Sequence, residues 1–147
     1  FNKINRIARS KCISLWKIQY QDCKKIFKSK RGTRSTMTYD SENIFAKILR
    51  SEIPCDKIFE NDFVLSFRDI NPKAKLHILI IPKKPYIDIA DFLENAEFDF
   101  QSNFWSSVNE IISLLDLGNK GFQMKSHKGK DGGQEVFHFH LHLLSNS

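Results

Sequence analysis

The sequence predicts an α+β fold, built on an antiparallel sheet of about five strands with two main helices. Short apolar stretches separated by turn residues are typical of strands, and one longer stretch has helical periodicity. The chain has 147 residues, of which 41% are hydrophobic. Since no apolar run approaches the roughly 18 residues that a membrane span needs, we expect one soluble domain without a membrane span.

The expected elements follow one another with local start and stop signals. A short helix opens at Ser41 and Glu42 and runs through Arg50. Three extended stretches come next, and Asn61-Asp62 forms a hairpin turn between the first two. A second, longer helix and two last strands follow. The expected ranges are 55–60, 63–68 and 76–81 for the first three strands, 97–117 for the long helix, and 121–126 and 136–144 for the last two strands.

The long helix carries an apolar stripe, which indicates that one face packs against the sheet. Gly118 follows as the expected C-cap. Phe104 and its neighbour Trp105 fit either the core or an interface. The stripe consists of Phe100, Phe104, Val108, Ile111, Ile112 and Leu115.

Three histidines, His138, His140 and His142, alternate with apolar residues near the C-terminus. Side chains on a strand point to opposite faces with a period of two, so the three imidazoles share one face. Three such groups on one strand indicate chemistry rather than structure. The opposite face enters the core with Phe139, Leu141 and Leu143.

A metal site is one alternative, because histidine is the commonest zinc ligand. Residues 138 and 142 of a strand lie about 13 Å apart, which two Zn–N bonds of about 2 Å span poorly. The cysteines, Cys12, Cys23 and Cys55, are scattered and form no Cys-x-x-Cys pair. We therefore expect no metal; a line of histidines along an extended anion fits the geometry better.

A glycine-containing loop, residues 128–135, precedes the histidines. Gly132 and Gly133 let backbone amides approach an anion closely, which suits a phosphate-contacting turn. An ordinary hairpin turn is the alternative, because Asp-Gly is a strong turn signal. The position of the loop immediately before the histidines favours the phosphate interpretation.

Residues 132–144, Gly-Gly-Gln-Glu-Val-Phe-His-Phe-His-Leu-His-Leu-Leu, resemble the signature of the histidine triad family, in particular its nucleotide-binding, purine nucleoside phosphoramidase branch. Further matching motifs lie upstream in the expected order, and the likeness covers residues 41–144. They are Ile-Phe-Ala-Lys-Ile at 44–48, Glu-Ile-Pro at 52–54, Phe-Arg-Asp-Ile-Asn-Pro at 67–72 and His-Ile-Leu-Ile-Ile-Pro-Lys-Lys at 77–84.

This resemblance implies a metal-free and cofactor-free hydrolase of purine nucleotide conjugates that works as a homodimer. His140 attacks the α-phosphate and forms a covalent nucleotidyl-histidine, which water then hydrolyses. His142 contacts the phosphate, while His138 and His77 orient the nucleophile. The amides of Gly133, Gln134 and Glu135 are candidate phosphate donors, and a donor to the leaving group is implied near Gln134 and Glu135.

The resemblance also implies where the nucleoside binds. Asp69 holds the ribose hydroxyls, although a turn-starting aspartate that caps nearby amides is the alternative from its context. The purine slot involves residues that would otherwise be ordinary core, and for Ile48 the core remains the preferred interpretation. The slot residues are Ile44, Phe45, Ile48, Ile53 and Ile70.

The chain departs from the family pattern at several positions. His127 stands where relatives commonly have an asparagine, so either a fifth imidazole approaches the site or that contact is lost. Glu135 and Pro85 replace a serine and a histidine of many relatives. The sequence ends at Ser147, whereas a longer tail in relatives can reach the partner's site, so leaving-group preference is the least determined property. Dinucleoside polyphosphate hydrolysis and nucleotide binding with little catalysis remain alternatives.

Residues 1–38 form a basic extension ahead of the domain expected at 39–147. The extension carries eleven Lys and Arg against one acidic residue, whereas the remainder has a net charge of −4. A targeting segment, sequence without a native role and a binding arm are the three interpretations. We do not expect nucleic acid binding. Cysteines without repeated spacing indicate a reduced, intracellular protein, cytoplasmic or nuclear unless the extension directs it to an organelle.

Overall fold

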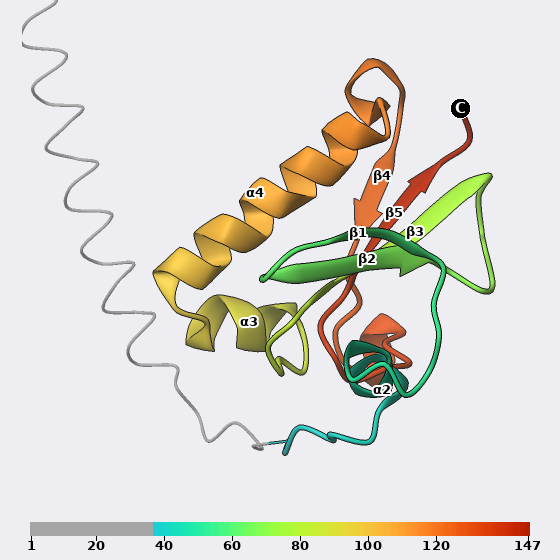
Figure 1. The fold of residues 1–147 in the computed structure, drawn as a ribbon. Helices are drawn as coiled ribbons and strands as arrows, with labels where there is room; N and C mark the ends of the chain where they lie inside the picture. The colour runs from blue at the N-terminus through green and yellow to red at the C-terminus, as the bar shows by residue number, and fades with distance from the viewer. Residues whose placement is uncertain (1–36) are drawn as a thin grey trace, which may run out of the picture. The chain divides into compact units, whose positions relative to one another are not determined.

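The computed structural model describes residues 37–147, so the three interpretations of the basic extension concern a segment that lies almost entirely outside the described residues. Figure 1 shows the arrangement of the elements. In chain order they are α2 (Ile44–Leu49), β1 (Lys57–Glu60), β2 (Val64–Arg68), β3 (Leu76–Pro82), α3 (Ile89–Asn95), α4 (Phe98–Leu114), β4 (Gln123–Lys125) and β5 (Leu141–Ser145), with short 3₁₀ turns at Leu117–Asn119 and Lys130–Gly132.

The strands form one antiparallel sheet in the order β1-β2-β3-β5-β4. This confirms the predicted fold class and the number of strands. The central strand β3 is buried along nearly its whole length, because it has neighbours on both sides and helices on both faces. β5 lies beside β3, so the C-terminal histidine segment comes next to His77.

The two faces of the sheet have separate apolar cores. One core joins α3 and α4 to the face that carries Ile78 and Ile80. The other joins α2 to the face that carries Leu79 and Ile81. Consecutive strand residues point to opposite faces, so β3 contributes to both cores. As predicted, the three apolar residues that alternate with the histidines, Phe139, Leu141 and Leu143, lie in the α4 core.

Several element boundaries differ from the sequence-based prediction. The last strand begins at Leu141 rather than at residue 136. α4 ends at Leu114, because Asp116 adopts a left-handed conformation (φ 52°) that stops the helix before Gly118, the expected C-cap. α3 was not predicted; Asp88 starts it by accepting hydrogen bonds from the amides of Ala90 and Asp91.

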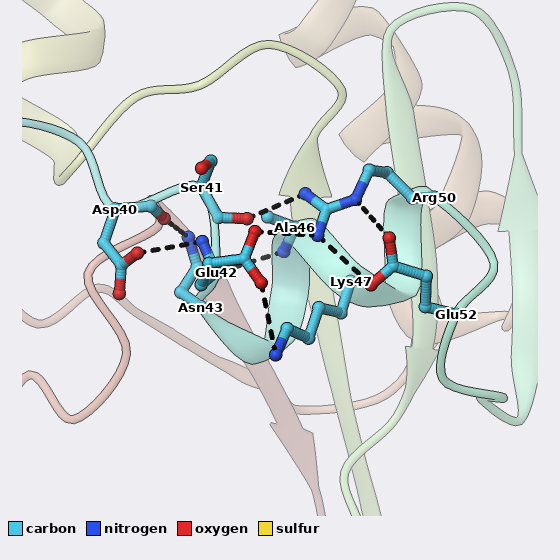
Figure 2. Close-up of polar contacts among 8 residues, drawn as sticks. All are labelled: Asp40, Ser41, Glu42, Asn43, Ala46, Lys47, Arg50 and Glu52. Carbon is cyan, nitrogen blue, oxygen red and sulfur yellow. Dashed lines mark hydrogen bonds and ion pairs between the residues drawn. The ribbon is translucent and has the colours of Figure 1, made fainter.

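α2 begins at Ile44 rather than at Ser41, because Asn43 is its N-cap. The Asn43 side chain accepts a hydrogen bond from the Ala46 amide and donates one to the Asp40 carbonyl (Figure 2). The chain before α2 is therefore a turn fastened to the helix. This helix and the segment leading into it cover the face of the sheet on which the histidines lie.

No helix in residues 37–147 is long and apolar enough to cross a membrane.

Candidate functional site

All five histidines of the chain gather at one place on the α2 face of the sheet. The ring of His142 on β5 has its centroid 4.9 Å from that of His140, 4.9 Å from that of His127 and 5.2 Å from that of His77 on β3. His138 joins them through its backbone carbonyl. The sequence predicted the three alternating imidazoles, and the structure brings His77 and His127 to them.

His138 is fully buried and is held at both ring nitrogens. Its Nε2 lies 3.0 Å from the Pro82 carbonyl, which can only accept, so Nε2 carries the proton. Its Nδ1 is then an acceptor and receives a hydrogen bond from the Tyr39 hydroxyl at 2.5 Å. Burial lowers the pKa of His138 from 6.5 to about 4. This ring is therefore neutral, with a fixed tautomer, and it faces protein rather than ligand.

His140 has the tautomer that a nucleophile needs. Its Nδ1 lies 2.7 Å from the backbone carbonyl of His138, so Nδ1 carries the proton and Nε2 keeps its lone pair. Burial is the main reason that the pKa of His140 is lowered, and the nearby His127 lowers it further. The ring packs edge-on against Phe45 of α2, at 5.1 Å between centroids. A neutral, oriented imidazole can attack an electrophile through Nε2.

His77 and His142 form a hydrogen-bond relay whose direction follows from its first donor. The Lys73 amide donates to His77 Nδ1 at 3.2 Å, which puts the proton of the neutral ring on Nε2. His77 Nε2 then donates to His142 Nδ1 at 2.9 Å. The proton of His142 accordingly sits on Nε2, a buried nitrogen with no partner among the described residues. His142 therefore offers one free donor, which suits an anionic oxygen.

The position of Asp69 is compatible with both of its expected roles, a cap of a turn and a contact to ribose hydroxyls. Its Oδ1 accepts a hydrogen bond from the Asn71 amide at 2.8 Å, as a turn-starting aspartate does. Its Oδ2 lies 3.4 Å from His77 Nε2. The carboxylate therefore keeps acceptor sites beyond the turn it caps.

Asp69, His77 and His142 are the residues of the described region that could hold a metal ion, with ligand atoms within 4.8 Å of one another. Coordination through His77 Nε2 would require the proton to move to Nδ1, where it would face the Lys73 amide, which is also a donor. A hydrogen-bond relay satisfies every one of these nitrogens except His142 Nε2, so the donor set fits a relay better than a metal centre.

The glycine-containing loop folds back on itself beside the histidines. Gly129 and Gly133 have positive φ values of 65° and 75°, which favour glycine. The Gly133 amide donates to the Lys130 carbonyl and the Gln134 amide to the Gly129 carbonyl. Of the three amides expected to contact phosphate, the Glu135 amide is thus the one without a partner in the described region.

Gln134 has a structural role that its sequence context did not reveal. The side chain is buried; its Oε1 accepts from the Gly129 amide and its Nε2 donates to the carbonyls of Ile87 and Val136. These bonds occupy both ends of the side-chain amide, so it is not free to donate to a leaving group. Glu135 is exposed.

The expected purine contacts divide into two groups. Phe45 and Ile48 are buried in the α2 core, as the sequence suggested for Ile48, and Ile53 packs partly buried against them. Ile44 and Ile70, by contrast, are 42% and 86% exposed. These two apolar side chains are accessible to a ligand.

Tyr39 is the site residue that sequence reasoning missed. It lies before all the motifs that resemble a known family, and a single tyrosine in an irregular segment carries no signal of its own. Its contact with His138 joins residues far apart in the sequence, so the folded chain alone reveals it.

The chain is similar in sequence to known proteins. A HIT domain matches residues 50–147. A HIT-like protein of Rickettsia prowazekii is 40% identical over 106 residues, which cover 72% of this chain and 88% of that protein.

Two solved structures have the same fold. A HIT family hydrolase from Legionella pneumophila is 36% identical with a TM-score of 0.66, and the match covers 72% of this chain and 94% of that one. A histidine triad nucleotide-binding protein from Candida albicans is 31% identical with a TM-score of 0.64, over 72% of this chain and 76% of that one.

Proposed function

The chain belongs to the HIT domain family, and from this we propose that it is a nucleotide-binding hydrolase that cleaves purine nucleoside phosphoramidates through a nucleotidyl intermediate on His140. The observation that carries the proposal is the tautomer of His140. Its Nδ1 proton is committed to the His138 carbonyl, which leaves Nε2 as an unprotonated nucleophile. The names of the Legionella and Candida relatives, a hydrolase and a nucleotide-binding protein, support the same reaction class.

In the first step, His140 Nε2 attacks the α-phosphorus of an AMP–amine conjugate. A bond forms between Nε2 and phosphorus while the bond from phosphorus to the amine nitrogen breaks. The amine leaves with the bonding electron pair and takes up a proton from solvent. In the second step, water attacks the phosphorus and releases AMP and a proton, and His140 regains its lone pair.

Charge that develops on the phosphoryl oxygens needs donors already in place. His142 Nε2–H is such a donor, because the relay from the Lys73 amide through His77 leaves its proton without a partner among the described residues. The Glu135 amide is a second candidate. Burial, with the neighbouring imidazoles, lowers the pKa of His142 to about 4, so this group donates as a neutral ring near neutral pH.

The nucleoside is assigned to the surface around Asp69. The carboxylate, with acceptor sites beyond its turn, binds the ribose hydroxyls, and exposed Ile44 and Ile70 contact the purine. Burial of apolar side chains that are open to solvent in the free protein contributes to purine affinity. His127 lies close enough to His142 to contact the same phosphate.

We further propose that the protein works as a homodimer through the β4 edge of the sheet. β4 has one neighbour, β5, so its outer backbone groups are unpaired within the described chain. Phe122 and Met124 on or beside this strand are 38% and 45% exposed. A second copy would cover both the edge and these side chains.

The function is tested by incubating the purified full chain with AMP linked to a lysine amine, in the presence of a metal chelator, and measuring AMP release. We expect release that persists in the chelator and disappears in the His140→Ala variant, which still binds AMP. Release that survives in His140→Ala would contradict the mechanism.

Absence of release from the unmodified protein, with AMP binding retained, would identify a nucleotide-binding module. Faster cleavage of a dinucleoside polyphosphate in a parallel assay would show that dinucleoside polyphosphates, rather than phosphoramidates, are the preferred substrate class.

A further inference from the structure

We propose that Tyr39 is a positioning residue for the nucleophile, acting on His140 through the ring and carbonyl of His138. The inference rests on the proposed function, in which His140 attacks phosphorus. Tyr39 lies before residue 50, where the HIT domain match begins. The nucleophile would therefore depend on a segment outside the part of the chain that the family match covers.

The ring of His138 has a partner at each of its two nitrogens. The Pro82 carbonyl fixes the proton on Nε2, so Nδ1 has a lone pair inside a fully buried side chain. An unpaired acceptor in such a position is costly. The Tyr39 hydroxyl is its partner at 2.5 Å, and the tyrosine ring also packs edge-on against the imidazole at 5.6 Å between centroids.

The backbone carbonyl of His138 orients the nucleophile. β5 begins at Leu141, so His138 lies outside the strand and the sheet ladder does not hold its carbonyl. That carbonyl accepts the Nδ1 proton of His140 and thereby sets the orientation of the nucleophile. The peptide that carries this carbonyl is held on its other side by the Phe139 amide, which donates to the Tyr86 carbonyl at 2.6 Å. The His138 imidazole, clamped between the Pro82 carbonyl and the Tyr39 hydroxyl, adds a second hold on the same residue.

Tyr39 can orient His138 only if its own position is fixed. The residues directly after it are fastened to α2 by a network shown in Figure 2. Asp40 accepts from the Glu42 amide at 2.8 Å and from the Asn43 side chain at 2.5 Å, and Arg50 donates to the Ser41 carbonyl at 2.7 Å. Burial raises the pKa of Tyr39, so the hydroxyl keeps the proton that it donates.

The test compares Tyr39→Phe with the unmodified full chain and with Ser41→Ala. Tyr39→Phe removes only the hydroxyl. Ser41→Ala removes a hydroxyl from the exposed turn directly after Tyr39 and leaves the Tyr39–His138 hydrogen bond in place. We expect kcat for the AMP–lysine conjugate to fall about tenfold in Tyr39→Phe, with KM within about twofold, because the lost bond orients the nucleophile and does not bind substrate. Ser41→Ala keeps both constants.

A second readout needs no substrate. In ¹⁵N NMR of the free proteins, the side-chain nitrogens of both His138 and His140 shift in Tyr39→Phe and stay in place in Ser41→Ala. A structural role alone would move the His138 signals and leave those of His140.

Unchanged His140 signals, or an unchanged kcat in an active protein, would overturn the inference. If the unmodified protein releases no AMP, the proposed function fails, and the His140 signals alone decide whether Tyr39 positions that ring.

Discussion

Acid should destabilise this protein through His138 in particular. The ring is fully buried, and its pKa is lowered from 6.5 to about 4, chiefly by burial. Below pH 6.5 the unfolded chain takes up a proton on this side chain, whereas the folded chain does not until about pH 4. Stability that is present above pH 6.5 is therefore lost as the pH falls through this window.

The size of the effect follows from the two pKa values. For one group with pKa 6.5 unfolded and about 4 folded, linkage gives a loss of about 2 kcal/mol in the free energy of unfolding between about pH 7.5 and about pH 5. That is a large share of the roughly 5–15 kcal/mol by which domains are stable. His142, with a lowered pKa but a less buried ring, adds to the same trend.

Urea unfolding at the two pH values, followed by Trp fluorescence, measures the loss. The variant to compare is His138→Gln, whose side-chain amide can still donate to the Pro82 carbonyl but takes up no proton. The substitution itself changes stability, so the informative quantity is the difference between the two pH values within each protein. We expect this difference to be about 2 kcal/mol smaller in the variant.

An equal pH dependence in the two proteins would refute the reasoning. It would mean that His138 takes up its proton equally well in the folded and unfolded chains.

Three further predictions concern the elements that support the site. Asn43→Ala removes the N-cap of α2 and should lower the free energy of unfolding by about 1 kcal/mol in urea titrations. Phe92→Ala removes a fully buried ring that stacks on Phe139, and a loss of about 3–5 kcal/mol is expected by the same method; less than 1 kcal/mol would show that the core refills the space. Gln134→Ala leaves the Gly129 amide and two carbonyls without their partner, so about 1–3 kcal/mol should be lost together with part of kcat; an unaffected kcat would show that the loop does not support catalysis.

The sequence predicted the α+β class and five strands, because period-two alternation and turn residues are local signals. Strand boundaries were less predictable. The alternation of His138, His140 and His142 suggested a strand from residue 136, but β5 begins at Leu141. His138 is instead held through its side chain, and no periodicity reports such a contact.

The candidate site, too, was predictable in part from the sequence. Alternation and motif spacing identified the histidines, yet the tautomers that give each ring its task depend on Pro82, Lys73 and the His138 carbonyl, which only folding brings near. The sequence predicted a donor to the leaving group near Gln134. In the structure, three hydrogen bonds instead hold the Gln134 side chain against the backbone of Gly129, Ile87 and Val136. Local patterns predict which residues gather, and tertiary partners determine what each one does.

The most direct test of the central claim is to locate the nucleotidyl group during the first turnover. Excess protein is mixed with AMP–lysine conjugate labelled in the adenosine, and samples are quenched in alkaline denaturant, in which a phosphorus–imidazole bond survives. Peptide mass spectrometry then finds the label. Our account predicts a transient adduct on His140 that forms before AMP appears. AMP that accumulates with no adduct, or an adduct on His142, would contradict it.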